Sequence, residues 1–280
     1  MLPPEAASGE EDETPIDPEM IDAEGLAEDG LSDDSDEAAA KAAEQEEDEE
    51  DLPDPKLAKA PVPTRKAMLA ALEKAFDQEE VLPGVLERYA DHAIYVLEGN
   101  KRVNLTAIVD PWEVAVKHYL DCWRATRWLP LMGRSCLDLG SGAGYPGMPT
   151  ALCEDMCKVT VCDSRKRKAE FMADAIAELN VKNAKAVWAR GEEHLITERY
   201  DVVFMRALSS VRENIRLLRK VRHSFKDLVL FKGPSWSREV RAAEREADRL
   251  GFQLDTVWEH ELPDEMGKRA LLVYRAPGAQ

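Results

Sequence analysis

Long apolar runs are absent from the 280-residue sequence, and positive charge is nearly absent from its first 55 residues. No apolar run approaches the ~18 residues that span a bilayer. The N-terminus is acidic, whereas a signal peptide begins with positive charge. We therefore expect a cytoplasmic protein without membrane association.

The N-terminal segment also lacks aromatic residues. Residues 1–55 contain 23 Asp and Glu against one Lys, and the first aromatic residue is Phe76. Such a segment buries too little apolar surface to offset the entropy of ordering the chain. We expect residues 1–63 to be a disordered acidic extension that ends in a proline-rich linker. After residue 55 the chain carries 36 Lys and Arg against 32 Asp and Glu, so its body is mildly basic.

Cysteine is sparse and odd in number: Cys122, Cys136, Cys153, Cys157 and Cys162. Four of them fall inside expected helices or strands, which favours buried, reduced thiols. No second Cys or His pair accompanies the Cys153–Cys157 spacing, so we predict no metal site.

The body is predicted to begin with helices and continue as an alternation of strands and helices. Three amphipathic helices are expected at 64–78, 84–97 and 111–128. The last begins with Asp110 as N-cap and Pro111 at its first position. Strands are then expected near 135–139, 158–162, 184–189, 201–205 and 227–231, with intervening helices near 147–154, 165–180, 209–223 and 235–250.

Two final strands, near 252–259 and 269–275, are predicted to form an antiparallel hairpin at a sheet edge. We therefore divide the body into an N-terminal helical cap, 64–130, and an α/β core, 131–280. Five parallel strands plus such a hairpin make a mostly parallel seven-stranded sheet. This Rossmann-like arrangement is that of class I methyltransferases that use S-adenosylmethionine (SAM).

The most distinctive stretch is SCLDLGSGAGYPGMP, residues 135–149. A short apolar run ends in an acid, and glycines follow at alternate positions, which predicts a buried strand turning sharply into a helix. Gly140 and Gly142 allow close approach of the backbone to a ligand. The spelling G-x-G-x-x-G at 142–147 favours a dinucleotide. The carboxylate of Asp138 instead favours the cationic, phosphate-free SAM.

In doubly wound sheets the ligand lies beyond the carboxyl ends of the strands. Asp163 follows the second strand, where it would accept hydrogen bonds from the ribose of SAM or NAD, or cap the next helix. Gly191 and Glu192 follow the third strand, where they either meet an adenine or form an exposed loop.

The segment after the fourth strand, 201–208, is informative through what it lacks. Methyltransferases that act on amide or exocyclic amine nitrogens usually carry an Asn/Asp-Pro-Pro-aromatic motif there, and those that attack pyrimidine carbon need a cysteine. Neither is present, so we expect an acceptor atom that already offers a lone pair. Guanine N7 is such an atom, and its methylation needs alignment and electrostatic placement but no general base.

Polar residues also precede the core. Asn104 lies in the segment 102–106, and Lys117, His118 and Asp121 are spaced to share one helix face. His118 is either a structural histidine or a functional one.

Six segments in this order are NLT at 104–106, KHYLD at 117–121, the glycine-rich stretch at 137–149, DSRKRK at 163–168, RAL at 206–208 and FKG at 231–233. Together, over about residues 65–275, they resemble the RsmG (GidB) family of bacterial ribosomal RNA methyltransferases. The resemblance implies SAM-dependent methylation of a guanine N7 in small-subunit (16S) ribosomal RNA. The implied partner is that RNA or the ribosomal subunit, and we expect a monomer.

The resemblance also implies roles by position. Arg206 would lie at the methyl-transfer end of the site, and Asn104, His118 and Lys232 match other motif positions near the pocket, which makes these four the catalytic candidates. With Arg206, the cofactor-binding candidates are Asp138, Gly140, Gly142, Tyr145, Asp163, Gly191 and Glu192.

Two positions depart from the family pattern. Tyr145 stands where Phe or Leu is usual, and its hydroxyl needs a partner if it is buried. Gly99 replaces a common tryptophan, which we expect to loosen the entrance to the pocket. Basic side chains that would suit RNA phosphates occur in two groups, at 165–168 and at Arg212, Arg216, Arg219 and Lys220.

Two other functions remain open. The literal glycine fingerprint is also that of an NAD-dependent oxidoreductase, and a non-catalytic RNA-binding ribosome-assembly factor would keep the same fold. Equilibrium binding of NADH compared with SAM tests the oxidoreductase alternative. Methylation of ribosomal subunits distinguishes an enzyme from a non-catalytic assembly factor.

Overall fold

The structure is a computed structural model in which residues 52–277 are described. The predicted disordered extension therefore lies, up to residue 51, outside the described residues. The linker that follows, residues 52–63, consists of turns and extended chain.

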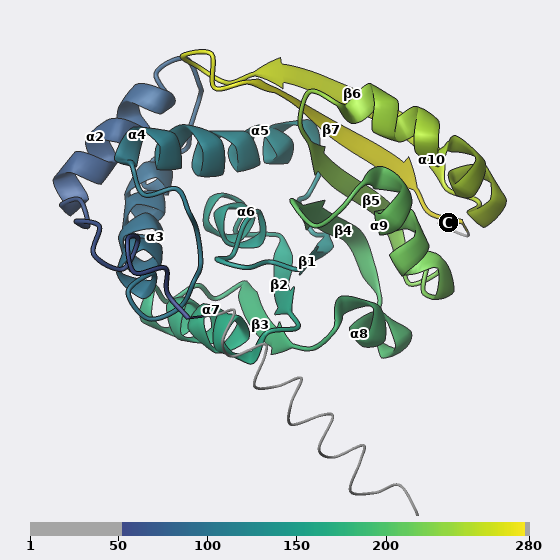
Figure 1. Ribbon diagram of the computed structural model, residues 1–280, viewed down its shortest axis with the longest axis horizontal. Coiled ribbons are helices and arrows are strands. Elements are labelled where there is room, and N and C mark those ends of the chain that lie inside the picture. The colour runs from purple at the N-terminus through teal and green to yellow at the C-terminus, as the bar shows by residue number, and fades with distance from the viewer. Residues whose placement is uncertain (1–51, 278–280) are drawn as a thin grey trace, which may run out of the picture. The chain divides into compact units, whose positions relative to one another are not determined.

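A seven-stranded sheet in the order β3-β2-β1-β4-β5-β7-β6 forms the centre of the fold (Figure 1). β1 to β5 are parallel, and β7 is antiparallel to both of its neighbours. The predicted sheet and its edge hairpin are confirmed. The strands are β1 (Ser135–Leu139), β2 (Lys158–Asp163), β3 (Ala184–Trp188), β4 (Tyr200–Arg206), β5 (Phe225–Lys232), β6 (Gln253–Glu261) and β7 (Lys268–Arg275).

Helices cover both faces of the sheet, because each face contributes its own apolar cluster. One cluster holds buried residues of α6 (Gly147–Cys153) and α7 (Lys166–Glu178). The other holds those of α8 (Gly191–Thr197), α9 (Val211–Leu217) and α10 (Trp236–Leu250). A short 3-10 turn, η2 (Leu218–Lys220), extends α9. Helix α8 was not predicted, since Leu195 is its one buried apolar side chain and gives no periodic signal.

The helical cap packs on the face that carries α6 (Figure 1). Tyr89 in α3 is fully buried and donates a hydrogen bond to the Pro149 carbonyl of α6, at 3.1 Å. Cap and core thus share one apolar cluster. The cap helices are α2 (Arg65–Ala75), α3 (Val85–Gly99), α4 (Pro111–Val114), the π-helix η1 (Ala115–Leu120) and α5 (Asp121–Trp128).

The prediction of one continuous helix over 111–128 was wrong in its middle. The helix begins as expected, because the Asp110 side chain accepts from the Glu113 amide at 3.0 Å. The six residues of η1 then adopt π geometry. A π segment widens the turn and redirects backbone carbonyls, and such segments are frequent at functional sites.

Gly99 does not loosen the structure. An added Cβ would lie 2.4 Å from the Phe171 ring and 2.8 Å from Leu105. The space that a tryptophan would take is therefore filled from α7, and the expected gap is absent.

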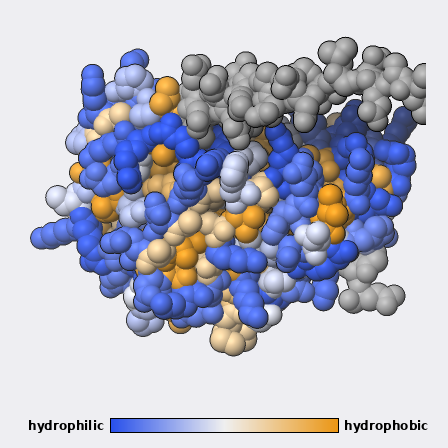
Figure 2. Space-filling model, turned by 90° about the horizontal axis from the view of Figure 1, so that it is seen from below, coloured by the Kyte–Doolittle hydropathy of each residue, from blue (hydrophilic) through white to orange (hydrophobic). Residues whose placement is uncertain are grey.

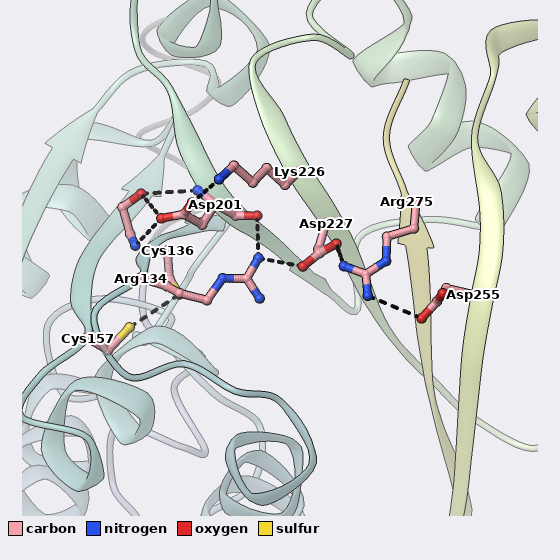
Figure 3. Close-up of polar contacts among 9 residues, drawn as sticks. Arg134, Cys136, Cys157, Asp201, Lys226, Asp227, Asp255 and Arg275 are labelled. Carbon is pink, nitrogen blue, oxygen red and sulfur yellow. Dashed lines mark hydrogen bonds and ion pairs between the residues drawn. The ribbon is translucent and has the colours of Figure 1, made fainter. Parts of the chain in front are cut away.

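Ion pairs link neighbouring strands at the amino edge of the sheet, where the parallel strands begin (Figure 3). Asp227, 2% exposed, binds Arg134 at 2.5 Å through one oxygen and Arg275 through the other. Next to them, Asp201 accepts hydrogen bonds from the amide and hydroxyl of Ser135. This edge joins β1, β4, β5 and β7.

The five cysteines are free thiols. Cys122, Cys136 and Cys162 are buried as predicted, whereas Cys153 is half-buried and Cys157, which lies outside the expected elements, is buried. Within residues 52–277, no helix is both long and apolar enough to cross a bilayer. In Figure 2 hydrophilic side chains predominate on the visible surface, and hydrophobic ones form small separate groups.

Candidate active site

The glycine-rich loop after β1 folds around the carboxylate of Asp138. Its Oδ2 accepts from the Gly147 amide at 2.7 Å and from the Ser141 hydroxyl. Its Oδ1 is buried and has no hydrogen-bond partner among the described residues. Burial raises the pKa of Asp138 to about 6, although both donors oppose the shift. A cationic group bound here would satisfy the free oxygen.

Gly142 and Asp163 join the loop to β2. The Gly142 amide donates to Asp163 Oδ2 at 2.8 Å, and the Arg165 amide donates to Oδ1 at 3.0 Å. Arg165 is the N-cap of α7, so Asp163 does not cap that helix. Each carboxylate oxygen retains acceptor capacity, which suits ribose hydroxyls. Gly142 has φ +59°, and nothing lies within 4 Å of an added Cβ.

Gly140 and Gly191 are constrained by packing. Gly140 has φ +72°, and an added Cβ would lie 2.5 Å from the end of the Leu208 side chain. At Gly191 an added Cβ would lie 2.3 Å from Leu139. The segment after β4 therefore reaches over the glycine-rich loop, and α8 begins directly against the end of β1. Glu192, beside Gly191, is half-buried.

Tyr145 finds the partner that its buried hydroxyl needs. It donates to the hydroxyl of Tyr119 at 3.1 Å, and Tyr119 lies 2.8 Å from His92 Nδ1. On its face, Tyr145 stacks against the His118 ring at 4.3 Å between centroids. The loop is thus locked to α3 and η1.

His118 is held as a neutral ring. Its Nε2 lies 3.0 Å from Thr106 Oγ1, and its Nδ1 has no partner in the described part of the chain. Burial, together with the charge of Arg206, lowers the pKa of His118 well below its usual value. Lys117 turns away to pair with Glu113 at 2.5 Å. The predicted shared face of Lys117, His118 and Asp121 does not form one polar group.

Arg206, at the end of β4, connects the loop to a neighbouring cavity. It donates to the Lys117 carbonyl of the π-helix at 2.5 Å and lies 3.4 Å from Asp121 Oδ2. The other oxygen of Asp121 is 3.1 Å from His260 Nε2. Of this group from β4, α5 and β6, Arg206 was predicted as a site residue. His260 was missed, because its position in the alternating pattern of an edge strand gives no signal of a site.

The cavity beside Arg206 has a volume of about 270 Å³. Arg206 and Lys232 both line it, so the structure brings two of the predicted residues together. The other lining residues with polar or aromatic side chains are Asp121, Trp128, Phe231, His260 and Arg269.

Lys232 and Asn104 differ in how they are held. Lys232 Nζ donates to the Ser209 carbonyl at 2.5 Å and pairs with Glu239 at 2.9 Å, which fixes the segment after β4 against α10. Asn104 is exposed, does not line the cavity and makes no side-chain hydrogen bond within residues 52–277. Asn100, which the sequence did not single out, organises this segment by accepting from the Leu105 and Thr106 amides at 3.0 Å.

The described residues include no group of three or more His, Cys, Asp or Glu side chains arranged to hold a metal ion. At the carboxyl edge, where the parallel strands end, the polar groups fit an organic cation. The loop offers the unpaired oxygen of Asp138, open space beside Gly142 and a second carboxylate in Asp163.

Comparison with known proteins agrees with this geometry. The model of the family described as "GidB: rRNA small subunit methyltransferase G" matches residues 85–266. Ribosomal RNA small subunit methyltransferase G of Carboxydothermus hydrogenoformans is 31% identical over 75% of this chain and 89% of its own. The protein of the same name from Solibacter usitatus is 32% identical over 72% of this chain and 99% of its own. The chain therefore belongs to the rRNA small subunit methyltransferase G (GidB) family, as its motifs indicated.

Proposed function

We propose that this protein transfers the methyl group of SAM to N7 of one guanine in small-subunit (16S) ribosomal RNA. The observation that carries the proposal is the buried carboxylate of Asp138, with one oxygen unpaired at the centre of the glycine-rich loop. Family membership supplies the reaction class.

The residues of the carboxyl edge fit SAM. Asp138 would neutralise a positive charge of the cofactor, Asp163 would accept from the ribose, and Gly142 leaves the space for close approach. Gly191 and Glu192 are the candidates for the adenosine end. When bound, SAM supplies an electrophilic methyl group on a sulfonium.

The cavity beside Arg206 is the candidate acceptor site. Guanine presents N7 and O6 as acceptors on one edge, and Arg206 and Lys232 are cationic donors at the cavity wall. Trp128 and Phe231 offer apolar surface to a base. Because its pKa is lowered well below the usual value, His118 is a weak base, consistent with a reaction that needs no general base. These residues align the base, and the rate depends on that alignment.

The test is a methylation assay with labelled SAM. Purified full-length protein is incubated with unmodified small subunits and, separately, with naked small-subunit RNA, and the modified base is then mapped. We expect one guanine labelled at N7. Labelling of another atom, or none in either substrate, refutes the proposal. Equilibrium binding of NADH in place of SAM would instead support the oxidoreductase alternative.

A variant pair tests the cofactor site. Gly140→Arg should abolish SAM binding in calorimetry, because the side chain must displace Leu208 from above the loop. Gly84→Arg is the matched control, since Gly84 has φ +80° and an added Cβ meets nothing within 4 Å. Undiminished SAM affinity in Gly140→Arg removes the main support for the site.

Asn104 tests the acceptor side. We expect Asn104→Ala to lower turnover on ribosomal substrate more than SAM affinity, because Asn104 is exposed at a family motif position outside the glycine-rich loop. Wild-type turnover in this variant removes Asn104 from the site.

A further inference from the structure

Helices α9 and α10 form one continuous surface outside the candidate active site. They lie side by side on the same face of the sheet (Figure 1). Each begins just beyond the carboxyl end of a parallel strand, α9 after Arg206 in β4 and α10 after Lys232 in β5. Both helices therefore begin at the carboxyl edge of the sheet, where Arg206 and Lys232 line the candidate acceptor cavity, and run away from that edge.

Arginines form a stripe along each helix. Spacings of three and four residues place side chains on one helix face. In α9 and its 3-10 extension the stripe is Arg212, Arg216 and Arg219. In α10 the stripe is Arg238, Arg241, Arg245 and Arg249, and all seven residues are exposed. At 1.5 Å per residue, the α10 stripe is about 16 Å long.

Three acids on these helices are engaged within the protein. Glu213 closes a capping box with Ser210. Glu239 accepts from the Val211 amide and pairs with Lys232. Glu246 pairs with Arg216 at 3.3 Å and also binds Arg249.

The other arginines of the stripes are not neutralised by ion pairs. Arg212, Arg219, Arg238, Arg241 and Arg245 form no ion pair with any residue of 52–277. Two exposed acids of α10, Glu244 and Asp248, are likewise without an ion pair in this part of the chain. As a whole α10 carries four acids beside its four arginines. Five arginines of the stripes without an ion pair nevertheless outnumber these two unpaired acids.

An open groove of about 590 Å³ lies along the stripes. Its lining includes Arg212 from α9 and Arg241, Arg245 and Arg249 from α10, with Glu244 and Glu246. Guanidinium groups bind phosphate oxygens in bidentate fashion. A row of them along a groove matches the repeating charge of a sugar–phosphate backbone.

We propose that the α9–α10 arginine stripes bind the phosphate backbone of the RNA substrate next to the modified guanine. This inference rests on the proposed function for the identity of the RNA. The contact is independent of base sequence and holds the strand while the guanine occupies the cavity beside Arg206.

The test removes two charges from the groove in the full-length protein. Arg241→Gln with Arg245→Gln keeps good helix formers at both positions. The control is Lys182→Gln with Lys185→Gln, which removes the same charge at the other edge of the sheet. Both lysines are exposed, Lys182 just before β3 and Lys185 within it. Dissociation constants for a small-subunit RNA fragment are measured from 50 to 200 mM salt, with thermal melts to verify folding.

We expect the arginine double variant to bind the RNA about tenfold more weakly at 0.1 M salt, and its salt-dependence slope to fall by about 2, one per lost phosphate contact. The control should match the wild type. The KM for ribosomal substrate should rise while kcat and SAM affinity stay unchanged.

Equal RNA affinity and slope in the two double variants overturn the proposal. Weakened binding of the intact subunit with unchanged binding of naked RNA also overturns it, since the stripes would then contact a protein. If the wild type binds RNA in this way but methylates no guanine, the proposed function fails and the RNA surface stands.

Discussion

The amino and carboxyl edges of the sheet each contain a buried aspartate, and the two aspartates differ in how their oxygens are paired. Asp227 at the amino edge is 2% exposed, and each of its oxygens faces an arginine (Figure 3). Asp138 at the carboxyl edge is 0% exposed, has two neutral donors on one oxygen and leaves the other unpaired. A buried charge is tolerated only when it is paired. We therefore assign the first edge to stability of the fold, and the second fits the proposed cofactor site.

Three further unpaired atoms lie near the glycine-rich loop and the cavity: His92 Nε2, His118 Nδ1 and His260 Nδ1. Each of these histidines uses its other nitrogen within the protein, with Tyr119, Thr106 and Asp121 respectively. The carboxyl edge thus contains unpaired polar atoms around the glycine-rich loop and the cavity. Substitutions at each edge should show which edge contributes to stability and which to binding.

The largest effect is expected at the amino edge. Asp227→Ala leaves Arg134 without its carboxylate and should lower the free energy of unfolding by about 3–5 kcal/mol in urea titrations. SAM affinity of the folded fraction should not change. Asp255→Ala, which removes an exposed partner of Arg275, is the control and should cost under about 1 kcal/mol. Equal losses in the two variants contradict the assignment of this edge to stability.

The next effect is expected at the carboxyl edge. Asp138→Asn removes the charge that would face the cofactor and should weaken SAM binding about 100-fold in calorimetry, as for a lost charged hydrogen bond. Its free energy of unfolding should stay within about 1 kcal/mol of the wild type or rise, because a neutral group is easier to bury. Ser141→Ala retains the charge and should weaken SAM binding less. A stability loss like that of Asp227→Ala would show that both edges are structural.

The raised pKa of Asp138 predicts a pH dependence of a definite sign. Below about pH 6 the carboxyl of the free protein is protonated and must lose its proton before it can pair with a cation. SAM affinity should therefore fall as pH falls, by up to about tenfold per pH unit below 6. Calorimetry from pH 5 to 8 measures this slope. The slope should vanish in Asp138→Asn, and its persistence there would assign it to another group.

The smallest effect compares the two ends of one strand. Lys232 and Lys226 are the terminal lysines of β5, one at each edge. Lys232→Ala releases the segment after β4 from α10 and should lower turnover about tenfold, about 1.4 kcal/mol of transition-state stabilisation. Its SAM affinity should change less. Lys226→Ala, which loses an exposed pair with Asp201, should leave turnover unchanged. The reverse pattern would place the acceptor site elsewhere.

The residues of the proposed cofactor half of the site could be identified from the sequence because their contacts are local. Asp138 meets donors within nine residues along a strand, a loop and a helix start, and Asp163 ends the adjacent strand. Tyr145 was correctly expected to need a hydroxyl partner, but the partner, Tyr119, could not be named, because it belongs to the cap.

The proposed acceptor half of the site depends on contacts between residues far apart in the sequence, which no local pattern predicts. Asp121 and His260 are 139 residues apart in sequence and meet because β6 runs parallel to β5 and ends at the carboxyl edge, where α5 begins. The π-helix was missed for a similar reason. Its sequence has ordinary helical periodicity, and its Lys117 carbonyl is paired with Arg206 from β4.

The sequence by itself determined the alternation of strands and helices, the glycine-rich loop and its carboxylate, because these depend on chemistry within one strand–turn–helix unit. The tertiary structure alone decided the cavity beside Arg206, the burial that leaves Asp138 half-paired, and the two arginine stripes as one surface. Each of these requires elements distant in the chain to pack together, and burial and charge pairing are properties of that packing.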